Sequence, residues 1–363
     1  MPITVRQKKA INAKENKVLV VASAGGAKTS VLTQRIINLI KSGVDTDKIV
    51  AITFTTLAAQ EMKKRIGEKA KDMFIGTIHS YANKICLSNN IDTYDFIMTE
   101  QFDKILEKAL TVSDLKYPEV EYLFIDEFQD TGKLEEEFIS KIPADNIYLV
   151  GDSRQIIYGF KNGDTDIFER YYDDPAFTKY YLNEDFRNPK NILDYADSFL
   201  AGDKQLGLNS VSKVKEKGLL RIGGGFRTLI EEIFSPEVTE YKDWYVLCRT
   251  NAEVDEAIKI LSENYIPTLT FKLGDFETTE QLQEQLEMNA VKVLTIHSSK
   301  GLTLPKVIVV GGQMFSLEER RISYVAATRA SKELYWCKPL CNGRKKKKEN
   351  KIEIGEGFTI LDS

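Results

Sequence analysis

Asp126 and Glu127 follow directly after residues 121–125, which are apolar apart from Glu121. An apolar run of this length predicts a strand that is covered on both faces. Two carboxylates at the end of such a strand suit a site that holds Mg²⁺ and polarises an attacking water, because Mg²⁺ takes oxygen ligands and keeps some of its waters. A solvated strand end is the alternative interpretation of this segment taken alone.

A second chemical pattern lies earlier, where residues 18–21 predict a strand and residues 31–40 have apolar side chains at helical spacing. In a P-loop, backbone N–H groups and the N-terminus of the next helix face the phosphates, a lysine adds a point charge and a hydroxyl reaches the metal. The loop here has the small and polar residues that this role needs, namely Ala22, Ser23, Ala24, Gly25, Gly26, Ala27, Lys28, Thr29 and Ser30. In isolation, a tight strand-to-helix turn is the alternative.

Length and composition limit the class of protein. The 363 residues are enough for two sizeable cores, and a hydrophobic share of 42% with a charged share of 29% is that of an ordinary soluble protein. The net charge of −4 excludes a globally basic nucleic-acid binder but leaves room for a locally basic groove. Residues 1–17 lack the apolar region of a signal peptide, and no apolar run is long enough to span a membrane. We therefore expect a cytoplasmic protein without membrane contacts.

Strand-like and helix-like stretches alternate along the chain, which predicts an α/β class with parallel sheets. The only two histidines, His79 and His297, stand in the same tetrapeptide, Thr-Ile-His-Ser. The repeat is either chance or the mark of two similarly built halves whose polar loops face a shared cleft at the strand ends. We expect a first domain at residues 1–180 with a small insertion at about 83–118, a second domain at 181–343 and a basic tail at 344–363. Residues 206–225 read as a surface connection.

Three further segments complete a family pattern: Asp-Glu-Phe-Gln-Asp-Thr at 126–131, a polar turn leading to aromatic residues at 151–161, and an amphipathic segment ending in Arg329. Together with the P-loop they resemble the UvrD/Rep/PcrA group of superfamily 1 helicases, from Gln7 to about Leu334. The resemblance implies two RecA-like parallel-sheet domains in tandem with an ATP cleft between them.

The resemblance also implies roles for single residues in ATP use. Lys28 and Thr29 would bind the β- and γ-phosphates and Mg²⁺, Asp126 the metal, and Glu127 the attacking water. The other implied nucleotide contacts are Gln7 for adenine, Phe186 for stacking on adenine, Gln155 for sensing the γ-phosphate, Gly301 near the nucleotide, and Arg187 and Arg329 as cations reaching the γ-phosphate from the second domain. For Arg329, a cation stabilised by the C-terminus of a helix is the alternative.

Single-stranded DNA contacts are implied at positions similar to those of the family: Phe54, Thr55, Thr77, His79, Tyr158, Phe160, Lys161, Thr295 and His297. Aromatic side chains suit this role because every base has a π-face. The alternative for Phe54 and Phe160 is an ordinary place in the core. The basic run at residues 344–348 is either a solvated tail or a nucleic-acid contact.

The chain departs from the family pattern in three places. Ala27 replaces the usual glycine before the P-loop lysine, so we expect slower or weaker ATP use but not its loss. Thr303 replaces the usual glutamate near the ribose. Only 45 residues separate Ser80 from Asp126 and 39 separate Asn251 from Val291, so the large accessory insertions of the family cannot fit.

These observations give one leading hypothesis, an ATP-dependent translocase and helicase that acts on single-stranded DNA and on its junctions with duplex, moving 3′ to 5′ by resemblance. The alternative is a nucleotide-gated DNA-binding or recruitment module with little turnover. An unrelated P-loop kinase would leave the histidine loops unexplained. We expect a monomer in a bacterial or phage-infected cell, working in DNA repair or replication, with protein partners in place of the missing insertions.

Overall fold

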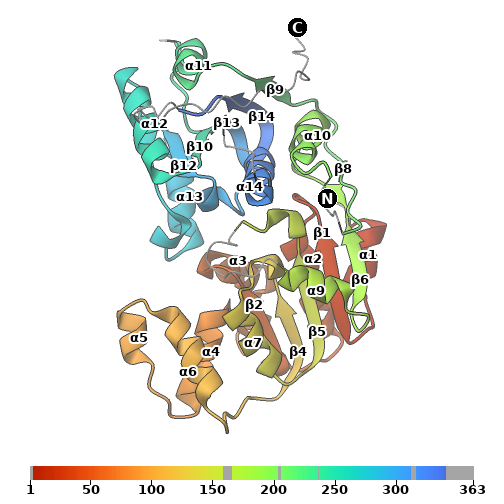
Figure 1. Cartoon of the computed structure of the whole chain (residues 1–363). Coiled ribbons are helices and arrows are strands. Elements are labelled where there is room, and N and C mark those ends of the chain that lie inside the picture. The colour runs from red at the N-terminus through yellow and green to blue at the C-terminus, as the bar shows by residue number, and fades with distance from the viewer. Residues whose placement is uncertain (1–2, 158–165, 203–205, 236, 312–315, 341–363) are drawn as a thin grey trace.

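The computed structural model describes residues 3–157, 166–202, 206–235, 237–311 and 316–340. Its ribbon forms two lobes, one above the other in Figure 1. Lobe 1 is the lower one and contains the chain up to Leu182, and lobe 2 is the upper one and contains the described residues from Asn183 onward.

Lobe 1 is built on a sheet whose described strands are all parallel, in the order β3-β2-β4-β5-β1-β6. The strands are β1 (Lys17–Ala22), β2 (Ile49–Thr53), β3 (Phe74–Thr77), β4 (Val120–Ile125), β5 (Ala144–Gly151) and β6 (Thr178–Leu182). Their successive side chains alternate between two apolar cores: in β1, Val18 and Val20 face one core, and Leu19 and Val21 face the other. Burial on both faces explains why residues 18–21 of β1 read as a continuous apolar run.

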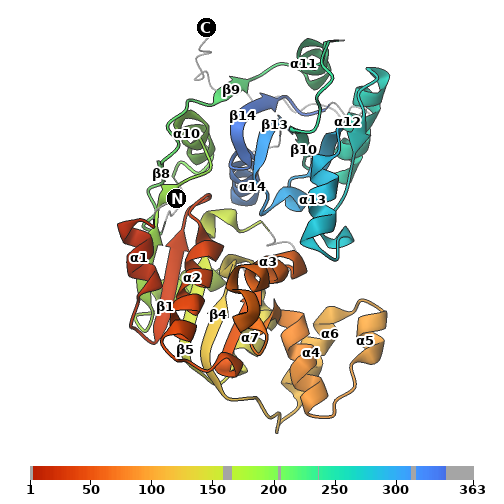
Figure 2. The same ribbon diagram turned by 180° about the vertical axis from the view of Figure 1, so that it is seen from behind.

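Helices cover both faces of this sheet. Figure 2, from behind, has α2 and α3 in front of the strands, whereas α7 and α9 lie in front of them in Figure 1. The described helices of lobe 1 are α1 (Val5–Ile11), α2 (Lys28–Lys41), α3 (Thr56–Ile66), α4 (Ile78–Ser88), α5 (Tyr94–Met98), α6 (Phe102–Thr111), α7 (Lys133–Lys141) and α9 (Ile167–Asp173). Helices α4, α5 and α6 form an extension at the lower left of Figure 1, and Ile105 and Leu106 join it to the core. Helices α5 and α6 lie within the expected insertion at about 83–118, whereas α4 begins before it, at Ile78.

Lobe 2 repeats this plan with the parallel order β11-β12-β10-β13-β14-β9. Its strands are β9 (Leu219–Ile222), β10 (Trp244–Cys248), β11 (Thr268–Leu269), β12 (Val291–Thr295), β13 (Leu304–Val310) and β14 (Ala330–Cys337). The expectation that residues 206–225 only connect elements was wrong, because β9 pairs with β14 and because Leu206 and Leu208 are buried in the core of lobe 1. A short pair, β7 (Glu184–Asp185) with β8 (Val211–Ser212), follows β6.

The helices of lobe 2 also lie on both faces of its sheet. Helices α11 (Phe226–Ile233) and α12 (Asn251–Glu263) pack on one face, and α10 (Lys190–Ser198) and α14 (Leu317–Ala327) pack on the other. Helix α13 (Thr279–Glu287) lies between the positions of Asn251 and Val291, where the family carries its second insertion. Within the described ranges, no helix is both long and apolar enough to cross a membrane.

The repeated tetrapeptide has the same place in both lobes. Thr77 ends β3 and Thr295 ends β12, and each threonine hydroxyl accepts a hydrogen bond from the backbone N–H of the serine three residues later, at 3.2 and 3.1 Å. At Thr77 this is the N-cap bond of α4, and at Thr295 the same side-chain bond turns the chain just after β12. The repeat therefore follows from the two similarly built halves.

Lys292, on β12, is fully buried, and its Nζ donates to the carbonyl oxygens of Lys242 and Met288, both at 2.7 Å. Burial lowers the pKa of this amine from 10.5 to about 8. Between these two values the unfolded chain holds a proton that the folded chain has released, so stability rises with pH there.

We predict that the free energy of unfolding of the wild type, relative to Lys292→Met, rises by about 1–2 kcal/mol between about pH 8 and pH 10. Urea unfolding followed by circular dichroism at several pH values measures this difference. Lys306→Met, on strand β13 of the same sheet, is the control and should give a flat difference. A flat difference for Lys292→Met as well would contradict the prediction.

Candidate nucleotide and nucleic-acid site

A cleft of about 1070 Å³ lies between the two lobes. Side chains that the sequence assigned to ATP use line it from both sides. Lobe 1 contributes Gly25, Gly26, Ala27, Lys28, Thr29, Ser30, Asp126, Glu127 and Gln155, and lobe 2 contributes Phe186, Arg187, Gly301 and Arg329. The structure thus brings residues from distant parts of the chain into one space.

The loop before α2 has little free room at its glycines. Gly25 has φ +66°, and a β-carbon there would lie 2.8 Å from Cγ of Asp185 and 3.0 Å from Cβ of Arg187. A β-carbon on Gly26 would lie 2.9 Å from the carbonyl oxygen of Ser23. Ala27, the N-cap of α2, has φ 60° and ψ 37°, which is the left-handed region where a β-carbon is disfavoured. The departure from the family pattern therefore carries backbone strain at the residue before Lys28.

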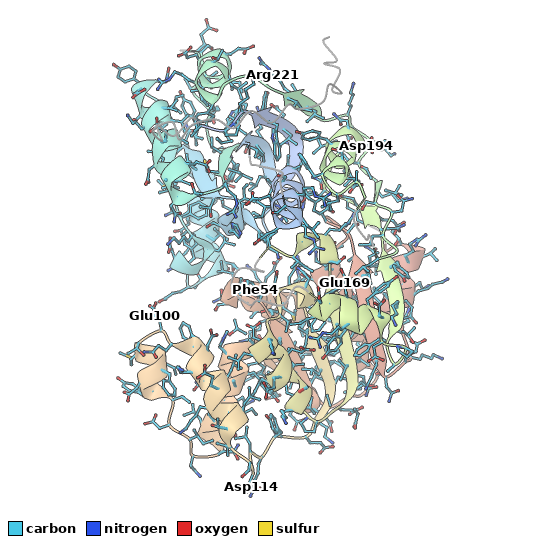
Figure 3. The ribbon with its side chains drawn as sticks, in the orientation of Figure 1. Phe54, Glu100, Asp114, Glu169, Asp194 and Arg221 are labelled. Atoms are coloured by element: carbon cyan, nitrogen blue, oxygen red, sulfur yellow. The ribbon has the colours of Figure 1, made fainter. Side chains whose placement is uncertain are left out.

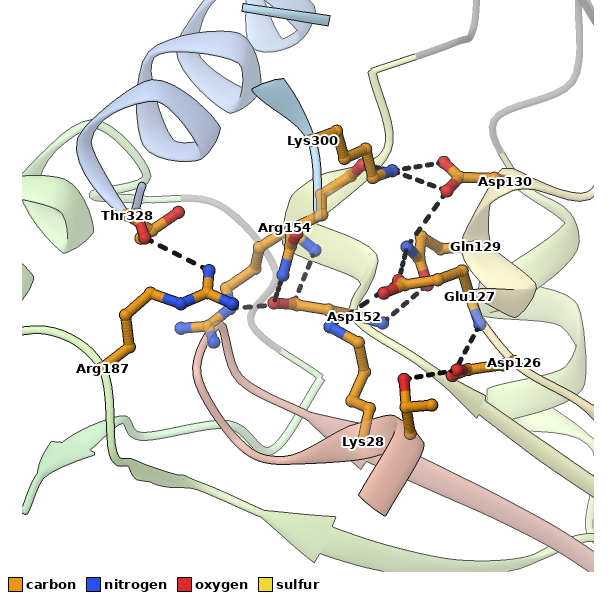
Figure 4. A network of polar contacts seen from close by, with 12 residues as sticks. Lys28, Asp126, Glu127, Gln129, Asp130, Asp152, Arg154, Arg187, Lys300 and Thr328 are labelled. Carbon is orange, nitrogen blue, oxygen red and sulfur yellow. Dashed lines mark hydrogen bonds and ion pairs between the residues drawn. The ribbon is translucent and has the colours of Figure 1, made fainter. Parts of the chain in front are cut away.

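Asp126 and Glu127 extend from the end of β4 toward α2. The Thr29 hydroxyl donates to Oδ2 of Asp126 at 2.6 Å, and Nζ of Lys28 lies 3.6 Å from Oε2 of Glu127 (Figure 4). Burial and the adjacent Glu127 carboxylate raise the pKa of Asp126 to about 6. Burial alone would raise the pKa of Glu127 too, but the cations Lys28 and Lys300 outweigh it and hold that pKa below its ordinary value. Glu127 is therefore an ionised carboxylate at neutral pH.

Two arginines reach the cleft from lobe 2. Arg329 follows α14 and is only 1% exposed; its Nε donates to the carbonyl oxygen of Val325 at 3.0 Å, and its Nη2 lies 3.5 Å from Oε1 of Gln155 in lobe 1. Burial and the neighbouring Arg187 lower the pKa of Arg329 to about 9, so it stays charged at neutral pH. Nη1 of Arg187 donates to the carbonyl oxygen of Thr328 at 3.3 Å.

A buried ion pair that the sequence analysis did not predict joins the lobes. Nζ of Lys300 donates to both carboxylate oxygens of Asp130 at 2.6 Å and to the carbonyl oxygen of Gln155 at 2.9 Å. The two side chains are 8% and 1% exposed. Burial raises the pKa of Asp130 to about 6 even though the Lys300 cation opposes this. Each residue lies in a segment that the sequence singled out, because Asp130 belongs to residues 126–131 and Lys300 directly precedes Gly301. Nothing in the sequence, however, indicates that these two residues contact each other.

Other predicted nucleotide contacts lie outside the lining of the cleft. The Oε1 of Gln7 accepts from the backbone N–H of Thr4 at 3.0 Å in the capping box of α1. Ser23 donates through both its backbone N–H and its hydroxyl to the carbonyl oxygen of Leu182, and Ala24 is buried against the core of lobe 2. Ala22 is the last residue of β1. Gln7 as an adenine contact stays a prediction.

The predicted DNA contacts fall into three groups. Phe54, Thr55 and His297 line the same cleft, and Figure 3 places Phe54 between the lobes; its side chain is 39% exposed, against the core alternative. Thr77 and Thr295 use their hydroxyls in the hydrogen bonds described above, and His79 contacts Oδ1 of Asp103 on α6 at 3.0 Å. Tyr158, Phe160 and Lys161, like the basic run at 344–348, lie outside the described residues.

A second contact between the lobes involves α3 and the segment that begins α13; we call it the α3–α13 contact (Gln60, Lys64, Glu277, Thr279, Glu280). The Gln60 amide donates to the carbonyl oxygen of Glu277 and accepts from the backbone N–H of Thr279. Nζ of Lys64 lies 3.0 Å from Oε1 of Glu280, with both side chains exposed. The short segment that replaces the second insertion thus touches lobe 1 directly.

Comparison with known families agrees with this geometry. The model of the UvrD/REP helicase N-terminal domain matches residues 3–108 and 86–176, and that of the UvrD-like helicase C-terminal domain matches residues 290–337. The matched residues make up more than half of the chain. The chain belongs to the UvrD/REP helicase family.

Curated relatives within this family are distant in sequence. A probable DNA helicase of Mycoplasma pneumoniae is 22% identical over 91% of this chain and 82% of its own length. A probable DNA helicase II homolog of Mycoplasma capricolum is 24% identical over 70% of this chain and 49% of its own, and the ATP-dependent DNA helicase PcrA of Staphylococcus epidermidis is 24% identical over 84% and 55%. The chain therefore spans only about half the length of the last two relatives. A solved structure titled "The structure of PRRSV helicase" aligns over 92% of this chain and 54% of its own, with 15% identity and a TM-score of 0.49.

The left-handed backbone at Ala27 gives a test of strain in this UvrD/REP P-loop. Relief of a strain of about 1–2 kcal/mol, less the greater entropy of glycine in the unfolded chain, should make Ala27→Gly more stable by about 0.5–1 kcal/mol. Ala24→Gly is the matched control in the same loop, because Ala24 is buried and lies outside the left-handed region, and it should lower stability. Urea unfolding measures both, and equal effects of the two changes would contradict this account.

The Lys300–Asp130 pair gives a second test. Lys300→Met leaves the Asp130 carboxylate buried without its cation, which should cost about 3–5 kcal/mol near neutral pH. The loss should shrink toward about pH 5, because the protonated carboxyl that then predominates in the variant needs no counter-ion. The double variant Lys300→Met/Asp130→Asn should recover much of the stability; a loss equal to the sum of the single changes would show that the pair does not interact.

Proposed function

We propose that this chain is an ATP-dependent translocase and helicase that moves along single-stranded DNA in the 3′ to 5′ direction and separates strands at junctions. The observation that supports it best is the interlobe cleft, lined by the phosphate-binding loop and carboxylates of lobe 1 and by Arg187 and Arg329 of lobe 2. Cations fixed near a transferring phosphoryl group can speed its transfer by about 10³–10⁵. With the arginines on the second lobe, hydrolysis would require a closed cleft, and opening would follow product release.

Each residue of the cleft fits one task in ATP hydrolysis. Glu127, kept ionised by Lys28 and Lys300, can orient a water and accept its proton. Lys28, Arg187 and Arg329 supply positive charge where the phosphate oxygens gain negative charge. Gln155, hydrogen-bonded to Asp152 at 2.8 Å and close to Arg329, is set to sense the γ-phosphate. Phe186 lines the cleft where the adenine ring would stack.

The residues present also fit a magnesium ion. Thr29 and Asp126 supply a hydroxyl and a carboxylate, which are oxygen ligands of the kind that Mg²⁺ prefers. Burial and the adjacent Glu127 carboxylate raise the pKa of Asp126, and a divalent cation would offset the repulsion between the two carboxylates. When bound, the ion would neutralise phosphate charge.

The DNA contact is proposed on the same cleft, since Phe54, Thr55 and His297 line it with the nucleotide residues. Stacking one base on an aromatic ring contributes about 1–3 kcal/mol, and melting one base-pair step costs about 1.4 kcal/mol. The two quantities are similar, so aromatic contacts that move with the lobes can hold bases as a duplex frays. In this proposal residues 1–180 form the first motor domain and 181–343 the second, the protein acts as a monomer, and protein partners replace the missing insertions.

The second candidate is a nucleotide-gated DNA-binding module with little turnover. Strain at Ala27 and the short insertions favour it. The ionised Glu127 and the two lobe 2 arginines favour the motor instead, because a module that only binds has no need of hydrolytic groups.

The ATPase rate with and without single-stranded DNA tests the proposal. We expect stimulation by DNA, and we expect Lys28→Ala and Arg329→Ala each to lower the stimulated rate by at least about 100-fold. Arg227→Ala, at an exposed ion pair of lobe 2, is the control and should keep the rate. No response to DNA would favour the recruitment module, and unwinding assays on duplexes with a 3′ or a 5′ single-stranded tail decide the direction.

A further inference from the structure

Arg154 is a buried cation for which the proposed chemistry has no role. It lies in the turn η4 (Ser153–Gln155) after β5 and is 1% exposed. A buried guanidinium is costly unless its charge and donors are matched. Its contacts therefore indicate what holds it there.

One set of these contacts is with residues that follow Leu182 in the chain, namely Asp197, Ser210 and Tyr324. Nη1 of Arg154 donates to the hydroxyl of Ser210 at 2.8 Å and lies 3.4 Å from Oδ1 of Asp197 on α10. The guanidinium carbon lies 4.9 Å from the centre of the Tyr324 ring on α14, in the geometry of a cation–π contact. Arg154 follows β5 of the lobe 1 sheet, and its guanidinium thus lies between α10 and α14 of lobe 2.

The other set of contacts is with Asp152, which connects Arg154 to Gln155, the predicted sensor of the γ-phosphate. Oδ1 of Asp152 accepts from the backbone N–H and from Nε of Arg154, both at 3.1 Å, and Oδ2 of the same carboxylate accepts from Nε2 of Gln155 at 2.8 Å. Asp152 is fully buried, so water does not compete for these oxygens. The Gln155 amide thus contacts Asp152 through its nitrogen, and its oxygen faces Nη2 of Arg329. One carboxylate is therefore shared by Arg154 and Gln155, and Figure 4 shows the contact of Asp152 with Arg154.

We propose that Arg154 is a positioning residue: through Asp152 it holds the amide of Gln155 in the orientation that meets Arg329, and it does so when lobe 2 is docked. The planar guanidinium suits this task because it can meet Asp152 through Nε and Asp197 with Ser210 through Nη1 at once. When lobe 2 moves away, Arg154 loses Asp197 of α10 and Tyr324 of α14 together, and the Asp152 carboxylate is held less firmly. The closure of the lobes and the orientation of the Gln155 amide then occur together. This inference rests on the proposed function.

The test is a double-mutant cycle on ATP hydrolysis with Arg154→Met, Gln155→Ala and both together. Arg154→Met should lower kcat at saturating ATP by about 10-fold or more and change KM by less than about 3-fold, since Arg154 does not line the nucleotide cleft. Because both changes act on the same amide, the double variant should be no slower than Gln155→Ala alone. Arg154→Lys should recover part of the rate. Losses that multiply in the double variant would overturn the proposal.

Two further arms keep the result interpretable. Asp197→Asn weakens the lobe 2 contact without touching Arg154 and should reproduce a smaller part of the same kcat loss, whereas Arg227→Met, an exposed arginine of lobe 2, should leave kcat unchanged. Hydrogen exchange of the amides at 152–157 is read in the same proteins without nucleotide. If the wild type hydrolyses no ATP, the proposed function fails, but faster exchange at 152–157 in Arg154→Met and Asp197→Asn still supports the positioning role, and unchanged exchange overturns it.

Discussion

A buried ion pair between the lobes, Lys300 with Asp130, is the contact on which the rest of the site depends. Lys300 contacts both oxygens of Asp130, and together with Lys28 it keeps Glu127 ionised although that side chain is partly buried. If lobe 2 were withdrawn, Glu127 would lose one of its two main cations, and Asp130 would lose the cation that opposes the effect of burial on its pKa. The charge state of lobe 1 is thus partly a property of the closed molecule.

The sequence predicts the fold well because its signals are local. Residues 18–21 are apolar without interruption and residues 121–125 are apolar apart from Glu121, since strands of a parallel sheet are buried on both faces, and the structure has β1 and β4 there. Residues 206–225 were misread, because β9 is short and largely exposed at the edge of its sheet and so lacks an apolar run.

The site was predictable only where the family pattern or a strand end marks it. Asp126 stands directly after β4, Lys28 follows the loop between β1 and α2, and the arginines follow from resemblance. Lys300 and Asp130 are 170 positions apart in the sequence, and Arg154 and Asp197 are 43 positions apart. No periodicity in the sequence relates such partners. Gln7 shows the opposite case, in which the pattern assigns a role while the structure engages the amide oxygen in a helix cap. Positions that carry strain, Ala27 and Glu127 with φ 60° and 53°, are also invisible to composition and spacing.

The α3–α13 contact has a consequence for how ionic strength acts on the molecule. Its ion pair, Lys64 with Glu280, faces water and is screened within about 8 Å at physiological salt, whereas Lys300 and Asp130 are shielded from mobile ions by the protein around them. Added salt therefore weakens one of the two bridges and spares the other. The outer contact between the lobes, α3 with α13, is thus sensitive to ionic strength, and the inner Lys300–Asp130 pair is not.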